Sequence, residues 1–167
     1  MQNNNNIQIA EQITGFYKSP IGYLEVITSN NKLNEIRFIE SDKELNHSSN
    51  ENNSFLNKVF SQLDEYFAGE RKEFDISLDS EGTSFQKNVW QKLTEIPYGK
   101  TTSYVDIATK IDNPKASRAI GNANNKNHIP IIIPCHRVIG KSGKMVGYAG
   151  GIWKKEWLLE HEKNISA

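Results

Sequence analysis

Cysteine is almost absent from this sequence, because Cys135 is the only one among 167 residues. A single cysteine excludes an internal disulfide and any zinc site built from several cysteines. A thiol that must stay reduced indicates a reducing compartment. The chain also has no GxGxxG fingerprint for a dinucleotide. The sequence therefore predicts neither a metal nor a cofactor.

Long apolar runs are absent as well. None approaches the roughly 20 residues that span a bilayer, and residues 1–12 lack the basic start and apolar core of a signal peptide. With 37% hydrophobic and 10% aromatic residues, a packed core is expected. We expect a soluble protein without membrane contacts, a monomer in the cytoplasm, associated with the nucleoid in a bacterium or nuclear in a eukaryote.

Net charge is zero, but the charges are unevenly distributed. Residues 1–80 carry 7 Lys and Arg against 13 Asp and Glu, whereas residues 81–167 carry 13 against 7. The halves therefore differ, at −6 and +6. This asymmetry fits a second half that faces a polyanion, and it fits equally two solvated surfaces of different composition.

The N-terminal half is predicted to follow the order strand, strand, helix, strand. Residues 23–28 and 33–40 alternate apolar and polar side chains, and the turn residues 29–32 join them as a hairpin. The polar stretch 41–53 is predicted to be a loop. No catalytic group of residues is evident in this half, so its expected role is structural support.

The helix of this half is expected from Ser54, its cap, to Gly69, where it ends. Its apolar residues recur at helical spacing: Leu56, Val59, Phe60, Leu63 and Phe67. Residues 73–79 alternate and predict a half-buried strand. Residues 79–83 form a plausible boundary, which gives two domains, 1–80 and 81–167.

Three helices are predicted after this boundary. The first, 84–96, places Phe85, Val89, Leu93 and Ile96 on one face. Residues 97–100 break it, and the second helix, 101–111, is capped by Thr102 or Ser103. In the third, 114–127, Asn113 is the expected cap and Pro114 takes the first position. Two short helices with so tight a turn resemble a helix-turn-helix.

The third helix has two different faces. One is apolar, with Ala116, Ala119, Ile120 and Ala123, and the other is small and polar, with Arg118, Gly121, Asn122 and Asn125. A small polar face with one arginine suits a nucleic-acid groove, where backbone amides meet phosphate and a long cation enters the base stack. An ordinary solvent-facing surface would have the same pattern.

The cysteine stands in a chemically distinctive stretch, IIIPCHRVIG (131–140). Prolines at both ends of IPIIIP (129–134) predict a rigid, buried segment rather than a central strand. His136 can accept the thiol proton, and a carboxylate would fix its tautomer. Such an arrangement would lower the thiol pKa toward neutrality. Three carboxylates downstream are candidates: Glu156, Glu160 and Glu162.

An inert buried cysteine beside a surface histidine is an equally ordinary interpretation of this pair. A cysteine protease is a further alternative, although its cysteine and histidine normally come from separated stretches.

A longer pattern is more specific. Residues 84–108, 113–140 and 147–162, with PCHRV at 134–138, resemble the active domain of the O6-alkylguanine-DNA alkyltransferases, also called methylated-DNA–protein-cysteine methyltransferases. The resemblance runs without a gap from 84 to 162. It implies an α+β fold, in which a ribonuclease-H-like antiparallel sheet with a helix precedes a mostly helical domain that contains a helix-turn-helix.

The resemblance also implies roles for individual residues. Cys135 would accept the alkyl group, His136 (through a water) and Glu162 would relay its proton, and Tyr104 would protonate the guanine leaving group. Asn127 would brace the active-site turn, and Lys155 would lie near the base pocket. The residues that would form the pocket are Val138, Tyr148 and Ala149. Arg118 would fill the vacated stack, and the further expected DNA contacts are Ser103, Ala116, Ser117, Gly121 and Ser142.

What the resemblance implies about function is a suicide reaction. Double-stranded DNA with O6-alkylguanine, and also O4-methylthymine, would be the partner, and the flipped base would transfer its alkyl group irreversibly to Cys135. The damaged DNA is itself the donor, so no cofactor is needed. Two other functions stay open from the residues alone, a DNA-binding module with an inert thiol and a thiol hydrolase that turns over many times.

Overall fold

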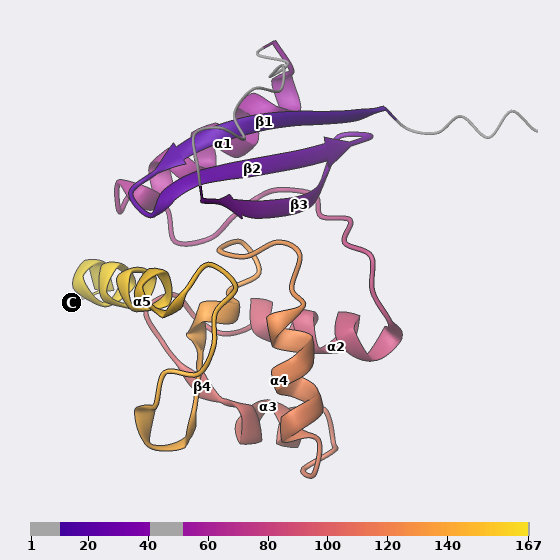
Figure 1. Cartoon of the computed structure of the whole chain (residues 1–167), viewed down its shortest axis with the longest axis vertical. Coiled ribbons are helices and arrows are strands. Elements are labelled where there is room, and N and C mark those ends of the chain that lie inside the picture. Colours follow the sequence, from indigo (N-terminus) through magenta and orange to yellow (C-terminus); the bar gives the residue numbers. More distant parts are fainter. Residues whose placement is uncertain (1–10, 41–51, 167) are drawn as a thin grey trace, which may run out of the picture.

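The computed structural model describes residues 11–40 and 52–166. Its N-terminal part is a three-stranded antiparallel sheet of β1 (Gln12–Ser19), β2 (Gly22–Ser29) and β3 (Lys32–Ile39), with helix α1 (Ser54–Phe67) against one face (Figure 1). The predicted hairpin is β2–β3. Its turn residues Asn30 and Asn31 both have positive φ, which Asn tolerates well.

The first strand, β1, was not predicted from the sequence. It pairs along its whole length with β2, from Gln12 opposite Ser29 to Ser19 opposite Gly22. Gly15 interrupts its apolar alternation, and the structure explains that glycine. A Cβ there would lie 2.6 Å from Leu56 Cδ2, because α1 crosses the strand at this point.

The strand predicted over 73–79 is wrong. These residues run extended, but their only strand-type pairing is an isolated bridge between Leu33 and Leu78. The side chain of Gln62 takes the place of a ladder, because it bonds both the carbonyl and the amide of Asp75, at 3.0 and 2.8 Å. The Gln62 side chain satisfies the backbone of Asp75, whereas Ser77 and Asp79 bond the backbone of Leu33 in β3, at 2.8 and 2.9 Å, so a single bridge forms in place of a ladder.

Helix α1 begins one residue earlier than predicted. Asn53, rather than Ser54, is its cap, with the Asn53 side chain accepting from the Leu56 amide at 2.9 Å. Gly69 follows its end with φ of +79°, as expected of a residue that terminates a helix. The predicted loop 41–53 lies outside the described residues apart from its last two.

The apolar face of α1 packs on the sheet as predicted. Leu56, Val59 and Leu63 are buried, and Phe60 and Phe67 are half-buried. Gln62 and Tyr66 are buried on the same helix, although the apolar spacing did not include them.

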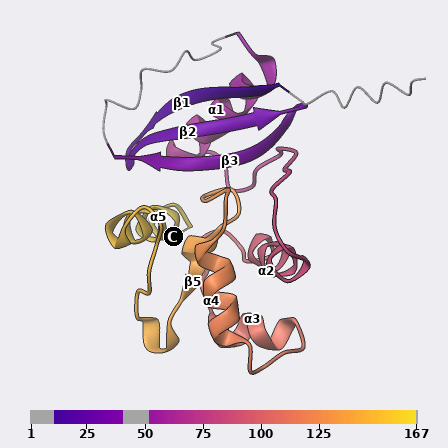
Figure 2. The same ribbon diagram turned by 45° about the vertical axis from the view of Figure 1, so that its right-hand side comes forward.

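The C-terminal part is mostly helical. Helix α2 (Ser84–Thr94) has a capping box of Thr83 with Gln86. It lies beside the pair α3 (Tyr104–Lys110) and α4 (Ser117–Asn125), which Figure 2 shows meeting at an angle. Of the two candidate caps for α3, the structure uses Ser103. The predicted helix-turn-helix is present.

Helix α4 starts later than predicted. Asn113 and Pro114 belong to a turn, closed by the Ala116 amide on the Asn113 carbonyl at 3.0 Å, and Ala116 is the cap without a side-chain hydrogen bond. The buried face also differs. Ala119 is exposed, whereas Asn124 is buried, since its amide group reaches a backbone carbonyl that needs a donor.

The segment between α4 and α5 (Ile152–Ser166) carries the cysteine. It contains the 3-10 helix η2 (Cys135–Arg137), the short strand β5 (Val138–Ile139), which pairs in parallel with β4 (Thr102–Ser103), and the 3-10 turn η3 (Lys141–Gly143). Residues 129–138 are all buried, as predicted for the proline-bounded run.

One core joins the two parts. Leu24 and Leu33 of the sheet, Leu63 of α1, Leu93 of α2 and Leu158 of α5 belong to the same cluster of buried residues. In both views α5 runs below the sheet and above the helix-turn-helix (Figures 1 and 2). The α+β fold is confirmed. No helix within 11–40 and 52–166 is long and apolar enough to cross a membrane.

Candidate active site

Cys135 is held in a short, rigid turn. Its side chain is 5% exposed, and its amide donates to the Ile133 carbonyl at 2.8 Å. The side chain of Asn127 bridges the same turn, donating to the Ile133 carbonyl at 2.8 Å and accepting from the Ile129 amide at 3.0 Å. From α4, the Asn124 amide group donates to the Cys135 carbonyl at 3.4 Å. The thiol is therefore fixed from both sides of the turn.

Burial decides the charge state of this thiol. It raises the pKa of Cys135 to about 11, although Asn127 and the nearby charge of Lys155 act in the opposite direction. The prediction of a thiol pKa near neutrality is therefore wrong for the DNA-free protein. Desolvation outweighs the favourable contacts, so at neutral pH the sulfur carries its proton and needs a base to remove it.

His136 lies next to the thiol and is fully buried. Its Nε2 lies 2.6 Å from Oε2 of Glu162, whereas its Nδ1 has no hydrogen-bond partner among the described residues. Burial lowers the pKa of His136, against the opposing pull of Glu162. The neutral ring therefore donates from Nε2 to the carboxylate and keeps a free lone pair at Nδ1.

Glu162 is the buried carboxylate among the three candidates, because Glu156 and Glu160 are exposed on the same helix. Burial by itself would raise the pKa of Glu162, but hydrogen bonds and charge from His136 and Arg137 hold it well below its ordinary range. Glu162 is therefore ionised beside a neutral histidine.

Three further groups donate to this carboxylate, and the sequence did not predict them. Arg137 donates from Nε to Oε1 at 2.8 Å and from Nη2 to Oε2 at 3.2 Å. The Tyr66 hydroxyl donates to Oε2 at 2.6 Å, and the Gly99 amide donates to Oε1 at 3.2 Å. Arg137 follows His136 in the sequence, and this position could have indicated that it donates to the same carboxylate. Nothing local points to Tyr66, which is 96 residues from Glu162.

Lys155 holds the loop that follows the cysteine through two hydrogen bonds to its backbone. Its side chain is fully buried, and Nζ donates to the carbonyls of Val138 at 2.7 Å and Val146 at 2.9 Å. Burial lowers the pKa of Lys155, and Cys135 acts against this shift. The carbonyl of Val138, one of the expected pocket residues, thus already accepts a hydrogen bond on one of its two lone pairs.

The remaining predicted pocket residues lie on this loop. Tyr148 is packed against Phe38 of β3, with ring centroids 5.6 Å apart, and its hydroxyl is buried without a partner in the described residues. Ala149 is exposed. The loop therefore presents one aromatic ring, packed against the N-terminal sheet, with an exposed alanine next to it.

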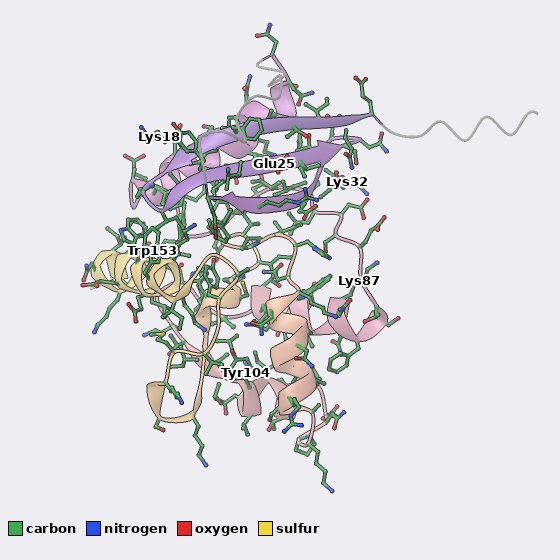
Figure 3. The ribbon with its side chains drawn as sticks, in the orientation of Figure 1. Lys18, Glu25, Lys32, Lys87, Tyr104 and Trp153 are labelled. Carbon is green, nitrogen blue, oxygen red and sulfur yellow. The ribbon has the colours of Figure 1, made fainter. Side chains whose placement is uncertain are left out.

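Tyr104 stands at the first position of α3 and faces α4 (Figure 3). Burial, and then the nearby Cys135, raise its pKa, so the phenol keeps its proton and remains a donor. A Cβ on Gly121 would be 3.8 Å from the Tyr104 ring, which means that α4 approaches it through its smallest residue.

The expected DNA contacts differ in accessibility. Arg118 is exposed and Ser117 half-buried at the start of α4, and Ser142 is exposed in η3. Ser103 is half-buried and uses its hydroxyl to cap α3, accepting from the Asp106 amide at 3.1 Å. Ala116 is buried, as its place on the predicted apolar face of the third helix implies, and the DNA contact expected of it stays a prediction. It covers the start of α4 against the core.

Comparison with known proteins matches both parts of the chain. Residues 84–164 match the family described as 6-O-methylguanine DNA methyltransferase, DNA binding domain, and residues 13–80 match its ribonuclease-like domain. A ribonuclease-like unit, followed by a DNA-binding unit that carries one buried thiol, defines a class of DNA-directed methyltransferases.

Whole-chain relatives give the same result. The methylated-DNA–protein-cysteine methyltransferase of Methanosarcina acetivorans is 51% identical over 148 residues, which is 87% of this chain and 95% of that protein. The Mycobacterium tuberculosis (strain H37Rv) protein of that name is 49% identical, over 87% and 89%. The chain belongs to the methylated-DNA–protein-cysteine methyltransferase family, a family of enzymes whose general role is DNA repair.

Solved structures of relatives are similar throughout. The crystal structure of the M. tuberculosis O6-methylguanine methyltransferase has a TM-score of 0.83 and 45% identity, covering 94% of this chain and 96% of that one. The M. tuberculosis OGT in complex with DNA has a TM-score of 0.82 and 45% identity, covering 92% and 93%. The part of this chain that matches the DNA-binding domain, residues 84–164, thus has a relative that has been crystallised with DNA.

Proposed function

We propose that this protein removes the alkyl group of O6-alkylguanine, and also of O4-methylthymine, from duplex DNA and keeps it permanently on Cys135. The observation that carries the proposal is the buried His136–Glu162 pair at 2.6 Å, directly next to the only thiol of the chain. A buried, protonated thiol needs such a base, because only the thiolate attacks carbon.

The chemical step is a displacement at carbon. His136 Nδ1 takes the proton of Cys135, through a water, and Glu162 stabilises the imidazolium that forms. The sulfur then forms a bond to the alkyl carbon as the bond from that carbon to guanine O6 breaks. The electron pair stays on the guanine, and Tyr104 supplies a proton at a ring nitrogen. The thioether product has no easy hydrolysis, so each molecule reacts once.

Access to the base requires its extrusion from the helix. Unstacking costs a few kcal/mol, and Arg118, exposed on α4, would offset part of this cost by entering the vacated stack. The small residues Ser117 and Gly121 would let α4 approach the minor groove. The extruded base would lie against Tyr148, with the backbone of Ala149 as a donor to its oxygen, and Lys155 and Asn127 would keep the pocket rigid.

The organisation that we propose around this site has two domains, 1–80 and 81–167, in a monomer. The sharp change of charge between these halves supports the division, since only the second half is basic. A cytoplasmic location suits a free thiol, because this compartment keeps cysteines reduced.

Mass spectrometry tests the proposal directly. The protein is mixed with duplex DNA containing one O6-methylguanine, and the peptide that holds Cys135 is weighed. We expect one added methyl mass, at most one turnover per molecule, and no transfer with Cys135→Ala, which should still bind the duplex.

Each rival function predicts a different result. A binding module with an inert thiol would leave the wild-type peptide unmodified. A thiol hydrolase would turn over many times on an ester or amide and leave the sulfur bare. Either result would contradict the proposal.

A further inference from the structure

The buried site contains a hydroxyl group that is hydrogen-bonded to Glu162 and that the mechanism above does not use. Tyr66 lies near the end of α1, in the N-terminal part, and its side chain is fully buried. Its hydroxyl donates to Glu162 Oε2 at 2.6 Å. This is the oxygen that His136 Nε2 also contacts at 2.6 Å. Two short hydrogen bonds therefore share one carboxylate oxygen.

The sharing has a chemical consequence. A carboxylate has a limited negative charge, and each donor that it accepts from makes it less basic toward the others. Arg137 Nε and the Gly99 amide donate to Oε1, and Arg137 Nη2 adds a longer hydrogen bond to Oε2 at 3.2 Å. On Oε2, the Tyr66 hydroxyl is the neutral donor that competes with His136. Burial, and the charge of Glu162, raise the pKa of Tyr66 well above its ordinary value, so this hydroxyl keeps its proton.

The geometry leads us to propose that Tyr66 is a positioning residue for the alkyl transfer. Its hydroxyl fixes Oε2 of Glu162 and limits how strongly this oxygen stabilises a protonated His136. The inference rests on the proposed function, in which His136 takes the thiol proton. It also gives the N-terminal part a chemical role beside structural support.

The Tyr66 side chain is held firmly enough for this role. Its ring contacts Phe67 and Tyr98 edge to face, with centroids 5.2 and 6.2 Å away. The Nε2 of His161 lies 2.9 Å from the Tyr66 carbonyl, which ties α1 to α5 at this residue.

Every charged or titratable neighbour of the relay comes from an identified element. Among the described residues these are Tyr66 from α1, Tyr98 from the segment after α2, Tyr104 from α3, Cys135 and Arg137 from η2, Tyr148 from the loop before α5, and Lys155 and His161 from α5. Among them, Tyr66 is a neutral group whose hydroxyl donates a hydrogen bond to the carboxylate, so its removal changes no net charge at pH 7.

Tyr66→Phe isolates the hydroxyl because it keeps the ring. The rate of Cys135 alkylation by iodoacetamide is measured from pH 6 to 11 on the full chain, together with methyl transfer from O6-methylguanine DNA. Without the hydroxyl, Oε2 attracts the His136 proton more strongly, and the thiolate–imidazolium pair forms at lower pH. We expect the midpoint of the alkylation profile to move down by roughly half a unit.

Two tyrosines serve as matched controls. Tyr17→Phe removes a hydrogen bond of the same length, which the Tyr17 hydroxyl donates to Asp64 of the same helix rather than to Glu162. Tyr98→Phe removes a buried hydroxyl without a partner in the described residues, beside the same carboxylate. Both are expected to keep the wild-type midpoint.

A second substitution covers the case in which Tyr66→Phe does not fold. Incorporation of 3-fluorotyrosine at position 66 keeps the hydroxyl and makes it a stronger donor, so the midpoint should move up. An unchanged midpoint in the folded variants, or shifts in the opposite directions, would overturn the inference.

The two proposals fail in different ways. If wild-type protein emerges from damaged DNA without a methyl group on Cys135, the proposed function is wrong. If the wild type is methylated and the Tyr66 variants titrate as the wild type does, only the role of Tyr66 is wrong.

Discussion

At the scale of the residue, the molecule combines an unreactive resting thiol with a base beside it. Burial raises the pKa of Cys135 to about 11, and the same burial keeps His136 neutral. A protonated thiol is protected from solvent electrophiles, and the free lone pair at Nδ1 gives it a route to ionise. Reactivity would therefore depend on the base, and the base depends on Glu162.

Glu162→Gln tests this dependence. Loss of the negative charge removes the group that stabilises an imidazolium, so His136 becomes a weaker base and thiolate forms only at higher pH. We expect the midpoint of iodoacetamide alkylation of Cys135 to move up, opposite to Tyr66→Phe. Glu160→Gln, an exposed change on the same helix, should leave the profile unchanged. A folded Glu162→Gln protein with the wild-type midpoint would contradict the relay.

At the scale of the element, the two faces of α4 have different surroundings. Its buried face reaches the active site, since Asn124 contacts the Cys135 carbonyl and the Ala123 carbonyl accepts from Trp90 Nε1 at 2.8 Å. Its open face presents Arg118 to solvent. One helix therefore joins the expected DNA surface to the turn that holds the thiol.

Arg118→Ala tests the open face. If Arg118 occupies the space of an extruded base, its loss should slow repair of duplex O6-methylguanine, by roughly 5- to 150-fold for an interaction of about 1–3 kcal/mol. The reaction with free O6-methylguanine needs no extrusion and should keep its rate. Lys115→Ala, which removes an exposed cation three residues away, controls for general charge. Equal slowing on both substrates would remove the proposed role.

At the scale of the whole molecule, Glu162 is a junction of distant segments. Its carboxylate receives donors from α1, from the turn after α2 and from η2, while it stands on α5 itself. The aromatic rings of Phe67 and Trp157, with centroids 5.8 Å apart, add a second contact between α1 and α5. The junction therefore ties the N-terminal part to the catalytic part.

The junction makes stability depend on pH. Glu162 has a pKa near 4.5 when unfolded and well below that when folded, so its contribution is complete above about pH 4.5 and is lost as pH falls toward the folded pKa. We expect the free energy of unfolding in urea to fall from pH 5 to pH 3, and Glu162→Gln to show a shallower fall.

His136 contributes in the same direction but in a different range. Folding lowers the pKa of His136, so its contribution to the free energy of unfolding begins to be lost below about pH 6.5, in the wild type and in Glu162→Gln. The comparison is therefore made below pH 5, with Glu160→Gln as the control that should follow the wild type. Identical slopes for the wild type and Glu162→Gln would contradict an ionised junction.

Prediction of the fold from the sequence succeeded where the pattern was local. The β2–β3 hairpin, the apolar face of α1 and the proline-bounded run before Cys135 all follow from spacing and turn residues. It failed where partners are distant. β1 was missed because Gly15 breaks its alternation, and the strand over 73–79 was wrong because the Gln62 side chain bonds the backbone of Asp75 and the segment makes a single bridge to β3, at Leu78.

The sequence by itself determined the chemistry of this protein. It placed one thiol next to a histidine in PCHRV, and it carried the motifs of the family over 84–162. Only the tertiary structure decided the charge state of that thiol and the full set of donors on Glu162. The physical reason is that desolvation and hydrogen bonding depend on which segments lie together in space, and Tyr66 and Glu162 are 96 residues apart along the chain.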